Sequence, residues 1–379
     1  MKKQIKVIVF IDWFYPAYKA GGPIKSVFNI VQSLKSEVDF LIVTSNQDVD
    51  GEILDIQPNE IIEKDGYDVV YFDRAHQKKS EYKKLYDGFT AEVIYHNSVF
   101  SKNFTLKPLL CFRKYKVKQL IAPRGMLGRG ALAIKPLKKK LFLRLFKRMF
   151  RKNKMLHWHA STSLERNEIV KVFGKDSKVI VAQNLSSASV KRKLAVDTKN
   201  VGELKLVLVS RISSKKNLLF ALELFQDLKS HEKLSLEIYG PIEDELYWKK
   251  CLLIIDADSR ITYNGNLKPT VITPVLQQHH FLILPTQHEN YGHAIAEAIN
   301  VGVPVLISDH TPWRDLASDK VGFDLSLTEM DNWKSTIEAL IQLDQASYEE
   351  MVVACHKYSL DHIVSEELVQ ENRKLFGFD

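Results

Sequence analysis

Short apolar runs alternate with segments of helical spacing along most of the chain. Residues 5–11 form a continuous apolar run, which is typical of a strand covered on both faces. Further strands are predicted at residues 40–44, 69–72, 93–96, 119–122, 157–162, 179–181, 204–209, 236–239 and 261–266. Because helical patterns separate many of these strands, the chain is expected to be an α/β protein with doubly wound parallel sheets.

The stretch 281–316 shows this pattern most fully. An apolar run at 281–284 is followed by a polar loop, by a helical pattern from about Tyr291 to Gly302, and by a second β-branched run at 303–307. Such a unit places a polar loop and a helix N-terminus at the carboxyl end of a strand, where open α/β sheets bind ligands. The unpaired N–H groups of that helix would suit phosphate oxygens.

Two features in the first half of the chain follow strands in the same way. Gly21 and Gly22 lie in the loop between the first strand and a helix, where paired glycines let the backbone approach an anion. An ordinary turn is the alternative. His96 ends another strand, so its side chain could reach a substrate or could be structural.

Length and composition fit a globular protein of two domains, with 379 residues, 45% hydrophobic and 26% charged residues. The chain contains no run of about 18 apolar residues, so no transmembrane helix is expected. The apolar run within residues 1–14 is interrupted by Asp12, and no signal-peptidase cleavage site follows it. This segment therefore predicts a strand and not a signal peptide. The three distant cysteines show no metal-ligand spacing and favour a reducing cytoplasm.

Residues 135–154 contain no acid, and their apolar residues alternate with lysines and arginines at helical spacing. This pattern predicts a basic amphipathic helix. The helix could lie on an anionic membrane surface, or it could be a core helix with a solvated basic face. The net charge of +8 indicates attraction to anions in general. Residues 186–200 are polar and lysine-rich, and are the best candidate for an interdomain linker.

Three groups of residues resemble one enzyme family. Glu289 and Glu297, followed by the run 302–305, resemble the E-x7-E signature of the retaining GT-B glycosyltransferases of family 4, also called group 1. Arg211 and Lys216, in the loop 210–217, resemble that family's donor-phosphate motif. Residues 123–127 resemble a subgroup that acts in bacterial polysaccharide and lipopolysaccharide assembly. The family's Pro-Asn-Gly motif is reduced here to Asn184 alone, which puts a role for that residue in doubt.

This resemblance implies a GT-B fold of two Rossmann-like domains facing a central cleft. Residues 1–190 would bind the acceptor, 201–360 would bind the nucleotide sugar, and a helix at 361–379 would cross back to the first domain. The activity implied is retaining transfer of a sugar to a glycan or lipid-linked acceptor. The nucleotide sugar is a substrate, so no cofactor is expected, and neither is nucleic acid as a partner. The location implied is cytoplasmic, and the protein could also bind peripherally to the inner face of the plasma membrane.

The resemblance also gives roles to individual residues. Glu297 would hold the ribose, Glu289 the hydroxyls of the donor sugar, and Arg124 the acceptor. The expected catalytic residues are Glu289, His96, Arg211 and Lys216, of which Arg211 and Lys216 also bind the diphosphate. The other expected donor-binding residues are the glycine backbone at Gly21 and Gly22 and the donor-loop residues Asn290, Tyr291, Gly292 and His293. Fixed cations that stabilise a departing diphosphate make a metal unnecessary.

Asp256 and Asp258 match the D-x-D metal motif of the other large glycosyltransferase fold. They follow an apolar helical run, however, and are interpreted as a helix end without a metal.

Two alternatives remain from the sequence. A noncatalytic basic protein could bind membrane or nucleic acid through 135–154, where Phe142, Phe146 and Phe150 interleave with cations. That reading leaves Glu289 and Lys216 without a role. The second alternative is a GT-B enzyme of different reaction, such as a phosphorylase or an epimerase.

Overall fold

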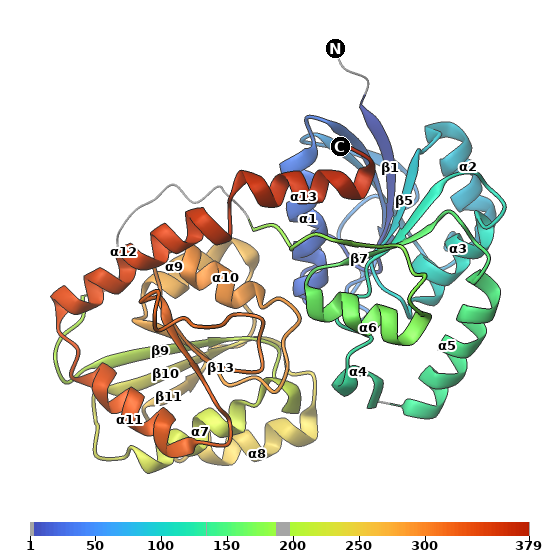
Figure 1. Ribbon diagram of the computed structural model, residues 1–379. Coiled ribbons are helices and arrows are strands. Elements are labelled where there is room, and N and C mark those ends of the chain that lie inside the picture. Colours follow the sequence, from blue (N-terminus) through green and yellow to red (C-terminus); the bar gives the residue numbers. More distant parts are fainter. Residues whose placement is uncertain (1–3, 134, 187–197, 379) are drawn as a thin grey trace. The chain divides into compact units, whose positions relative to one another are not determined.

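The computed structural model describes residues 4–133, 135–186 and 198–378. The chain divides into two compact units, each built around one sheet (Figure 1). Unit 1 comprises Met1–Leu185 and Glu366–Asp379, and unit 2 comprises Ser186–Ser365. Most of the predicted linker, residues 187–197, lies outside the described residues.

Unit 1 contains an eight-stranded sheet of order β3-β4-β2-β1-β5-β6-β7-β8. All neighbouring strands are parallel except β3 and β4, which are antiparallel. The strands are β1 (Ile5–Phe10), β2 (Val38–Ser45), β3 (Ile61–Lys64), β4 (Tyr67–Phe72), β5 (Val93–His96), β6 (Lys118–Ile121), β7 (Leu156–Ala160) and β8 (Val179–Val181). The predicted parallel sheet is therefore confirmed, and β3 is an additional edge strand that the apolar pattern did not reveal.

Helices cover both faces of this sheet. Alternate residues of β1 point to opposite faces, so Val7 and Val9 pack with α1 and α13, whereas Ile8 and Phe10 pack with α2 and the segment around α3 (Figure 1). The helices of unit 1 are α1 (Gly22–Leu34), α2 (Lys79–Phe89), α3 (Lys107–Cys111), α4 (Arg129–Ala133), α5 (Pro136–Phe150), α6 (Ser163–Phe173) and the C-terminal α13 (Glu366–Phe376). An ion pair of 2.6 Å between Arg373 and Glu37 helps to hold α13 on unit 1.

Unit 2 contains a six-stranded, fully parallel sheet of order β11-β10-β9-β12-β13-β14. Its strands are β9 (Leu204–Val209), β10 (Leu234–Tyr239), β11 (Ile261–Tyr263), β12 (Phe281–Leu284), β13 (Val305–Ser308) and β14 (Gly322–Leu325). Its helices are α7 (Leu218–Asp227), α8 (Glu245–Ile255), α9 (Ile272–Gln277), α10 (His293–Asn300), α11 (Met330–Ile341) and α12 (Gln345–His362). Figure 1 shows α7, α8 and α11 on one face of the sheet and α9, α10 and α12 on the other, as in a doubly wound fold.

The basic helix predicted at 135–154 is α5, and its apolar residues divide into two groups. Phe146 and Phe150 are buried and pack with Trp158 of β7 in a core cluster. Leu137, Leu141 and Leu145 are 82%, 58% and 50% exposed. One face of α5 is therefore a core face, while a second apolar stripe lies in solvent. No helix among the described residues is long and apolar enough to cross a membrane.

Candidate functional site

The central feature of unit 2 is an ion pair between two loops at the carboxyl edge of its sheet. Lys216 lies between β9 and α7, and Glu289 lies between β12 and α10. The two strands are neighbours, so residues 73 positions apart meet there. The Lys216 Nζ atom pairs with Glu289 Oε2, and the two side chains are only 13% and 14% exposed. This pair sits where doubly wound sheets bind their ligands.

Backbone hydrogen bonds fix these two loops against each other. Gln287 N and Thr286 Oγ1 donate to the carbonyl of Lys215 at 2.8 and 3.1 Å. Glu289 N donates to the carbonyl of His310 at 3.1 Å, in the loop after β13. The lysine and the carboxylate are therefore held in position by the backbone and do not depend only on their own attraction.

The charge state of Glu289 is set by its surroundings. Burial alone would raise the pKa of its carboxyl, but the charge and hydrogen bond of Lys216 and the charges of Lys215 and Arg211 outweigh it and hold the pKa below the ordinary value. Burial, with the nearby lysines, lowers the pKa of the adjacent His288. Glu289 is therefore anionic, and its loop carries a fixed negative charge among several cations.

Arg211 occupies the start of the same loop as Lys216. Its guanidinium pairs with Glu243 at 2.8 Å, and both side chains are nearly half exposed. An exposed pair of this kind contributes little to stability and exchanges partners easily. Arg211 can therefore turn from Glu243 toward an anionic ligand at modest cost.

The N-terminus of α10 is built for close packing. Gly292 precedes the helix with φ of 87°, and a Cβ atom there would lie 2.8 Å from Ile295 Cδ1 and 3.2 Å from Glu289 Cγ. Glycine is thus required both by the backbone conformation and by the approach of the Glu289 side chain. Glu297 is the fifth residue of α10, and Asn290 lies in the loop before it.

Aromatic side chains support this helix terminus. The Tyr291 ring is buried, with its centroid 5.6 Å from that of Trp313 and 5.0 Å from that of His293. The Trp313 indole N–H donates to the carbonyl of Tyr291. Sequence reasoning missed Trp313 as a support of the donor loop, although a tryptophan in the loop after a buried strand was a signal for it.

In unit 1, the paired glycines begin α1. Gly21 has φ of 71°, and its Cβ direction is open, so the backbone conformation and not packing requires glycine there. The preceding loop is held by Asp48, whose carboxylate accepts hydrogen bonds from the backbone N–H groups of Tyr18 and Lys19 at 3.0 and 3.3 Å. The glycine loop therefore has a fixed shape, with Gly22 as the first residue of the helix.

His96, the catalytic candidate of unit 1, is fully buried. Its ring stacks on Phe10 with centroids 5.8 Å apart, and its Nε2 atom lies 3.4 Å from Gln119 Oε1. Burial lowers the pKa of the imidazole to about 4. A neutral, covered imidazole of this kind favours the structural interpretation that the sequence left open.

Arg124, the expected acceptor ligand, has its guanidinium engaged inside unit 1. The Nε atom donates to Asn97 Oδ1 at 2.7 Å, one terminal nitrogen donates to Tyr95 Oη at 2.7 Å, and the other donates to Asn184 Oδ1. Tyr95 in turn contacts His159 Nδ1 at 2.7 Å. Asn184, which lacks the flanking proline and glycine of the family motif, therefore has a structural role as a hydrogen-bond partner of Arg124.

Asp256 and Asp258, the two acids of the D-x-D match, lie at the end of a helix. Asp256 is the residue that follows α8, and Asp258 forms a 2.6 Å ion pair with Arg260. Among the residues described, no cluster of three or more potential metal ligands is found.

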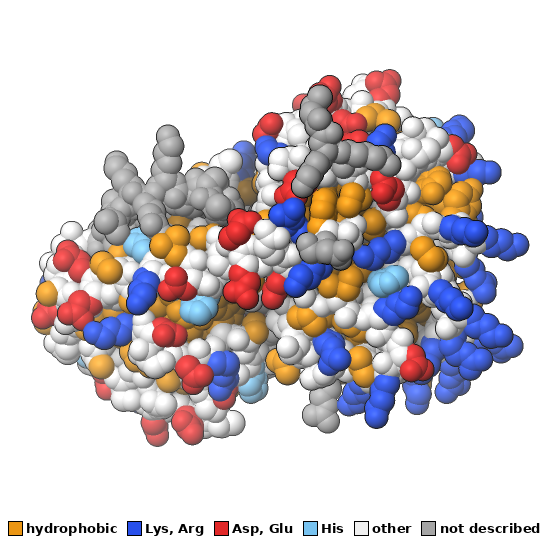
Figure 2. Space-filling model, turned by 45° about the horizontal axis from the view of Figure 1, so that its top comes forward, with side chains coloured by type: hydrophobic (Ala, Val, Ile, Leu, Met, Phe, Trp, Pro, Cys, Tyr) orange, Lys and Arg blue, Asp and Glu red, His pale blue; other side chains and the backbone are white. Residues whose placement is uncertain are grey.

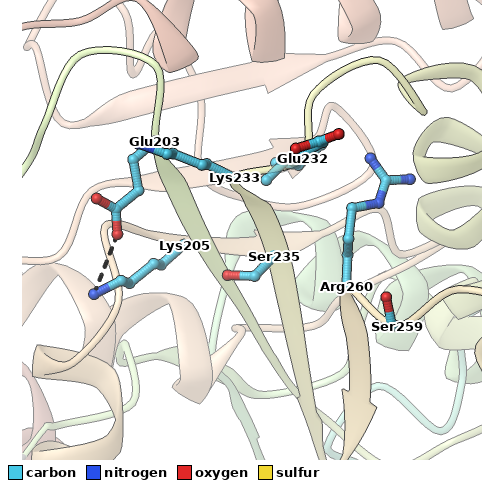
Figure 3. A pocket seen from close by; sticks show the side chains of 8 residues that line it. Glu203, Lys205, Glu232, Lys233, Ser235, Ser259 and Arg260 are labelled. Carbon is cyan, nitrogen blue, oxygen red and sulfur yellow. Dashed lines mark ion pairs between the residues drawn. The ribbon is translucent and has the colours of Figure 1, made fainter.

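A hollow of about 490 Å³ in unit 2 lies at the opposite edge of the sheet, where β9, β10 and β11 begin (Figure 3). Three of its charged side chains already have partners, with Glu203 and Lys205 3.4 Å apart and Arg260 held by Asp258. Because ligands of doubly wound sheets bind at the carboxyl edge, this hollow is not the candidate site.

Comparisons with known proteins give a family match over part of the chain and a consistent fold. Residues 190–358 match the family described as "Glycosyl transferases group 1". HepE of Anabaena, solved in complex with UDP and glucose, superposes with a TM-score of 0.71 at 13% identity, covering 98% of each chain. WaaG, a glycosyltransferase involved in lipopolysaccharide biosynthesis, gives 0.66 at 11% identity, again over 98% of each chain. A glycosyltransferase of Rickettsia africae gives 0.67 at 11% identity and the same coverage. No curated protein sequence matches the chain.

These similarities confirm the predicted GT-B fold of two Rossmann-like domains. The family match covers unit 2, including the loops that carry Arg211, Lys216 and Glu289. Together they support a glycosyltransferase.

Proposed function

We propose that this chain is a retaining, metal-independent glycosyltransferase of family 4. It would transfer a sugar from a nucleotide-sugar donor to a glycan or lipid-linked acceptor in bacterial surface polysaccharide synthesis. The observation that carries this proposal is the Lys216–Glu289 pair, with Arg211 nearby, at the carboxyl edge of the unit 2 sheet. The match to group 1 glycosyltransferases and the UDP and glucose bound to HepE support it.

The pair suits a donor with a sugar next to a diphosphate. A carboxylate held anionic accepts hydrogen bonds from sugar hydroxyls, and an adjacent ammonium and guanidinium bind phosphate oxygens. As the bond between the sugar and the diphosphate breaks, negative charge grows on the leaving group. Lys216 and Arg211 would stabilise that charge most in the transition state, which is the condition for catalysis.

Retention and metal independence rest on this charge arrangement and on the E-x7-E resemblance. Fixed protein cations would do what a divalent metal does in other transferases, so no metal ligands are needed. With an oxocarbenium-like transition state, the leaving phosphate would take the proton of the acceptor hydroxyl on the same face of the sugar. Glu297 would hold the ribose through its place on α10.

The charge distribution of unit 1 favours a membrane-bound acceptor. Residues 93–164 contain 18 lysines and arginines and no acid, so the rest of the chain carries a net charge of −10. Figure 2 shows Lys and Arg side chains crowded on one part of unit 1. The exposed leucines of α5 lie among exposed cations, including Lys138, Lys140 and Lys147. We propose that α5 rests on an anionic lipid surface, its leucines meeting the acyl boundary and its cations the headgroups.

One experiment separates this function from its alternatives. A panel of nucleotide sugars is screened for thermal stabilisation, since a ligand at about 100 times its Kd stabilises by roughly 2.7 kcal/mol. The donor that binds is then incubated with glycan and lipid-linked acceptors, and the anomeric configuration of the product is read by NMR. Binding without transfer to any acceptor would favour an epimerase, whereas stabilisation by a sugar 1-phosphate instead would favour a phosphorylase. No stabilisation by any nucleotide sugar would favour a noncatalytic basic protein.

A further inference from the structure

A second pocket lies wholly within unit 1, at the carboxyl edge of its sheet. It has a volume of about 320 Å³, at the small end of the range for ligand sites. The loops that follow β1, β2, β4 and β5 contribute its lining, which consists of Asp12, Trp13, Ser45, Gln47, Arg74, Gln77, Asn103 and Phe104. Strand order reverses at β1, which lies between β2 and β5, and such switch points hold the ligands of doubly wound sheets.

The polar groups of the pocket wall are held in place by hydrogen bonds. Ser101 Oγ donates to Asp12 Oδ1 at 2.6 Å, and Asn103 Nδ2 donates to Gln77 Oε1 at 2.6 Å. Gln77, only 5% exposed, donates through Nε2 to the carbonyl of Phe72 at 3.1 Å. A carboxyl, amides and a hydroxyl fixed around one small space match the many hydroxyl groups of a sugar, and the Trp13 ring offers an apolar face.

Arg74 distinguishes this pocket from an ordinary polar hollow. Its side chain is exposed, and within the described residues its guanidinium forms no ion pair or hydrogen bond. The adjacent Asp73 does not neutralise it, because that carboxylate accepts hydrogen bonds from Asn59 at 3.0 Å and from His76 at 2.9 Å. Arg124, by contrast, is engaged with three protein groups.

From this contrast we propose that the pocket binds an acidic or phosphorylated sugar of the acceptor. Asp12 and the amides of Gln77 and Asn103 hold its hydroxyls, and Arg74, not Arg124, holds its anionic group. A planar guanidinium forms paired hydrogen bonds with a carboxylate or a phosphate, so both sources of negative charge fit. This inference rests on the proposed glycosyltransferase function and names the chemistry of its acceptor.

The test uses the full chain and three small probes, namely glucose, glucuronic acid and glucose 6-phosphate, with binding measured by ligand-observed NMR. The wild type is expected to bind at least one anionic sugar more tightly than glucose, and the preferred one identifies the anion. Arg74→Gln should weaken binding of that sugar roughly tenfold or more, the range for loss of a charge-assisted hydrogen bond, and leave glucose binding unchanged. Asp12→Asn should weaken all three.

Arg166→Gln is the matched control, because Arg166 is an exposed arginine of α6 outside the pocket. It should bind every probe like the wild type. Inorganic phosphate is a fourth probe. If it binds as tightly as glucose 6-phosphate, or if Arg74→Gln and Arg166→Gln behave alike, the pocket is not a site for anionic sugars.

Nucleotide-sugar binding is measured on the same samples, since it depends on unit 2. Wild-type urea unfolding of Arg74→Gln and Asp12→Asn shows that both variants are folded, since donor binding in unit 2 does not report on unit 1. A wild type that binds nucleotide sugars but no anionic sugar overturns this inference alone. A wild type that binds no nucleotide sugar overturns the proposed function.

Discussion

Replacing Lys216 by alanine is the sharpest test of the candidate site, because it removes two separate effects. Lys216 is proposed to stabilise the departing diphosphate, and loss of one such fixed donor raises the activation barrier by about 3 kcal/mol. Turnover should therefore fall roughly a hundredfold. Lys216 is also the partner of Glu289, which is 14% exposed. Leaving that carboxylate unpaired should lower the free energy of unfolding by about 1–3 kcal/mol.

The two effects are separated by adding Glu289→Gln to Lys216→Ala. The double variant removes the unpaired charge, so it should regain part of the stability, measured by urea unfolding, but none of the turnover. Lys249→Ala is the control, because Lys249 is an exposed lysine of α8 and belongs to neither of the two loops. It should retain most of the transfer rate.

The pH dependence of stability gives an independent check on the same pair. The pKa of Glu289 is lowered in the folded chain, so the pair contributes stability above the ordinary carboxyl pKa. That contribution is lost as the pH falls through the lowered pKa, and the wild type should lose more stability in this acid range than Lys216→Ala. Wild-type turnover in well-folded Lys216→Ala, assayed with the donor identified by screening, would refute the assignment of the donor site.

Three further predictions test other parts of the argument. EDTA should leave the transfer rate unchanged, and loss of activity that Mn²⁺ restores would contradict the metal-independent mechanism. The protein should sediment with anionic liposomes at low salt and be released at high salt, since each exposed cation contributes about 1 kcal/mol. Changing Lys138, Lys140, Lys147 and Arg148 to glutamine should abolish sedimentation but not transfer to a soluble acceptor. A wild-type protein that does not sediment with anionic liposomes at low salt would refute the membrane proposal. Gly292→Ala should destabilise the fold by about 1–2 kcal/mol in urea unfolding, because alanine is strained at φ of 87°. Unchanged stability would show that the backbone conformation at this position does not require glycine.

Lys139 of α5 is not changed in the liposome variant, because its side chain contacts other parts of unit 1. Lys139 donates to the carbonyl of Ala131 and lies 5.2 Å from the centroid of the Phe100 ring. It supports the fold of unit 1 and is therefore left intact. Helical spacing alone could not distinguish Lys139 from the exposed lysines beside it.

Most of the strands, and the loops that follow them, could be predicted from the amino-acid sequence. Continuous apolar runs identified the buried parallel strands, because such strands must be apolar on both faces. Since β9 and β12 were recognised in this way, Lys216 and Glu289 could be placed at strand ends before their distance was known. The edge strand β3 and the short β14 were missed, because β3 is largely exposed and β14 half-buried, and neither has the apolar run of a central strand.

Which of the polar side chains that follow the strands have partners within the protein could be seen only in the folded chain. Arg74 and Arg124 both follow strands of unit 1, yet Arg124 is engaged with three side chains and Arg74 with none that the described residues provide. His96 could have faced a substrate, but it is covered by Phe10. The physical reason is that hydrogen bonding and burial depend on segments far apart in the chain, such as Tyr95 and Asn184, which local patterns of hydrophobic and polar residues do not encode.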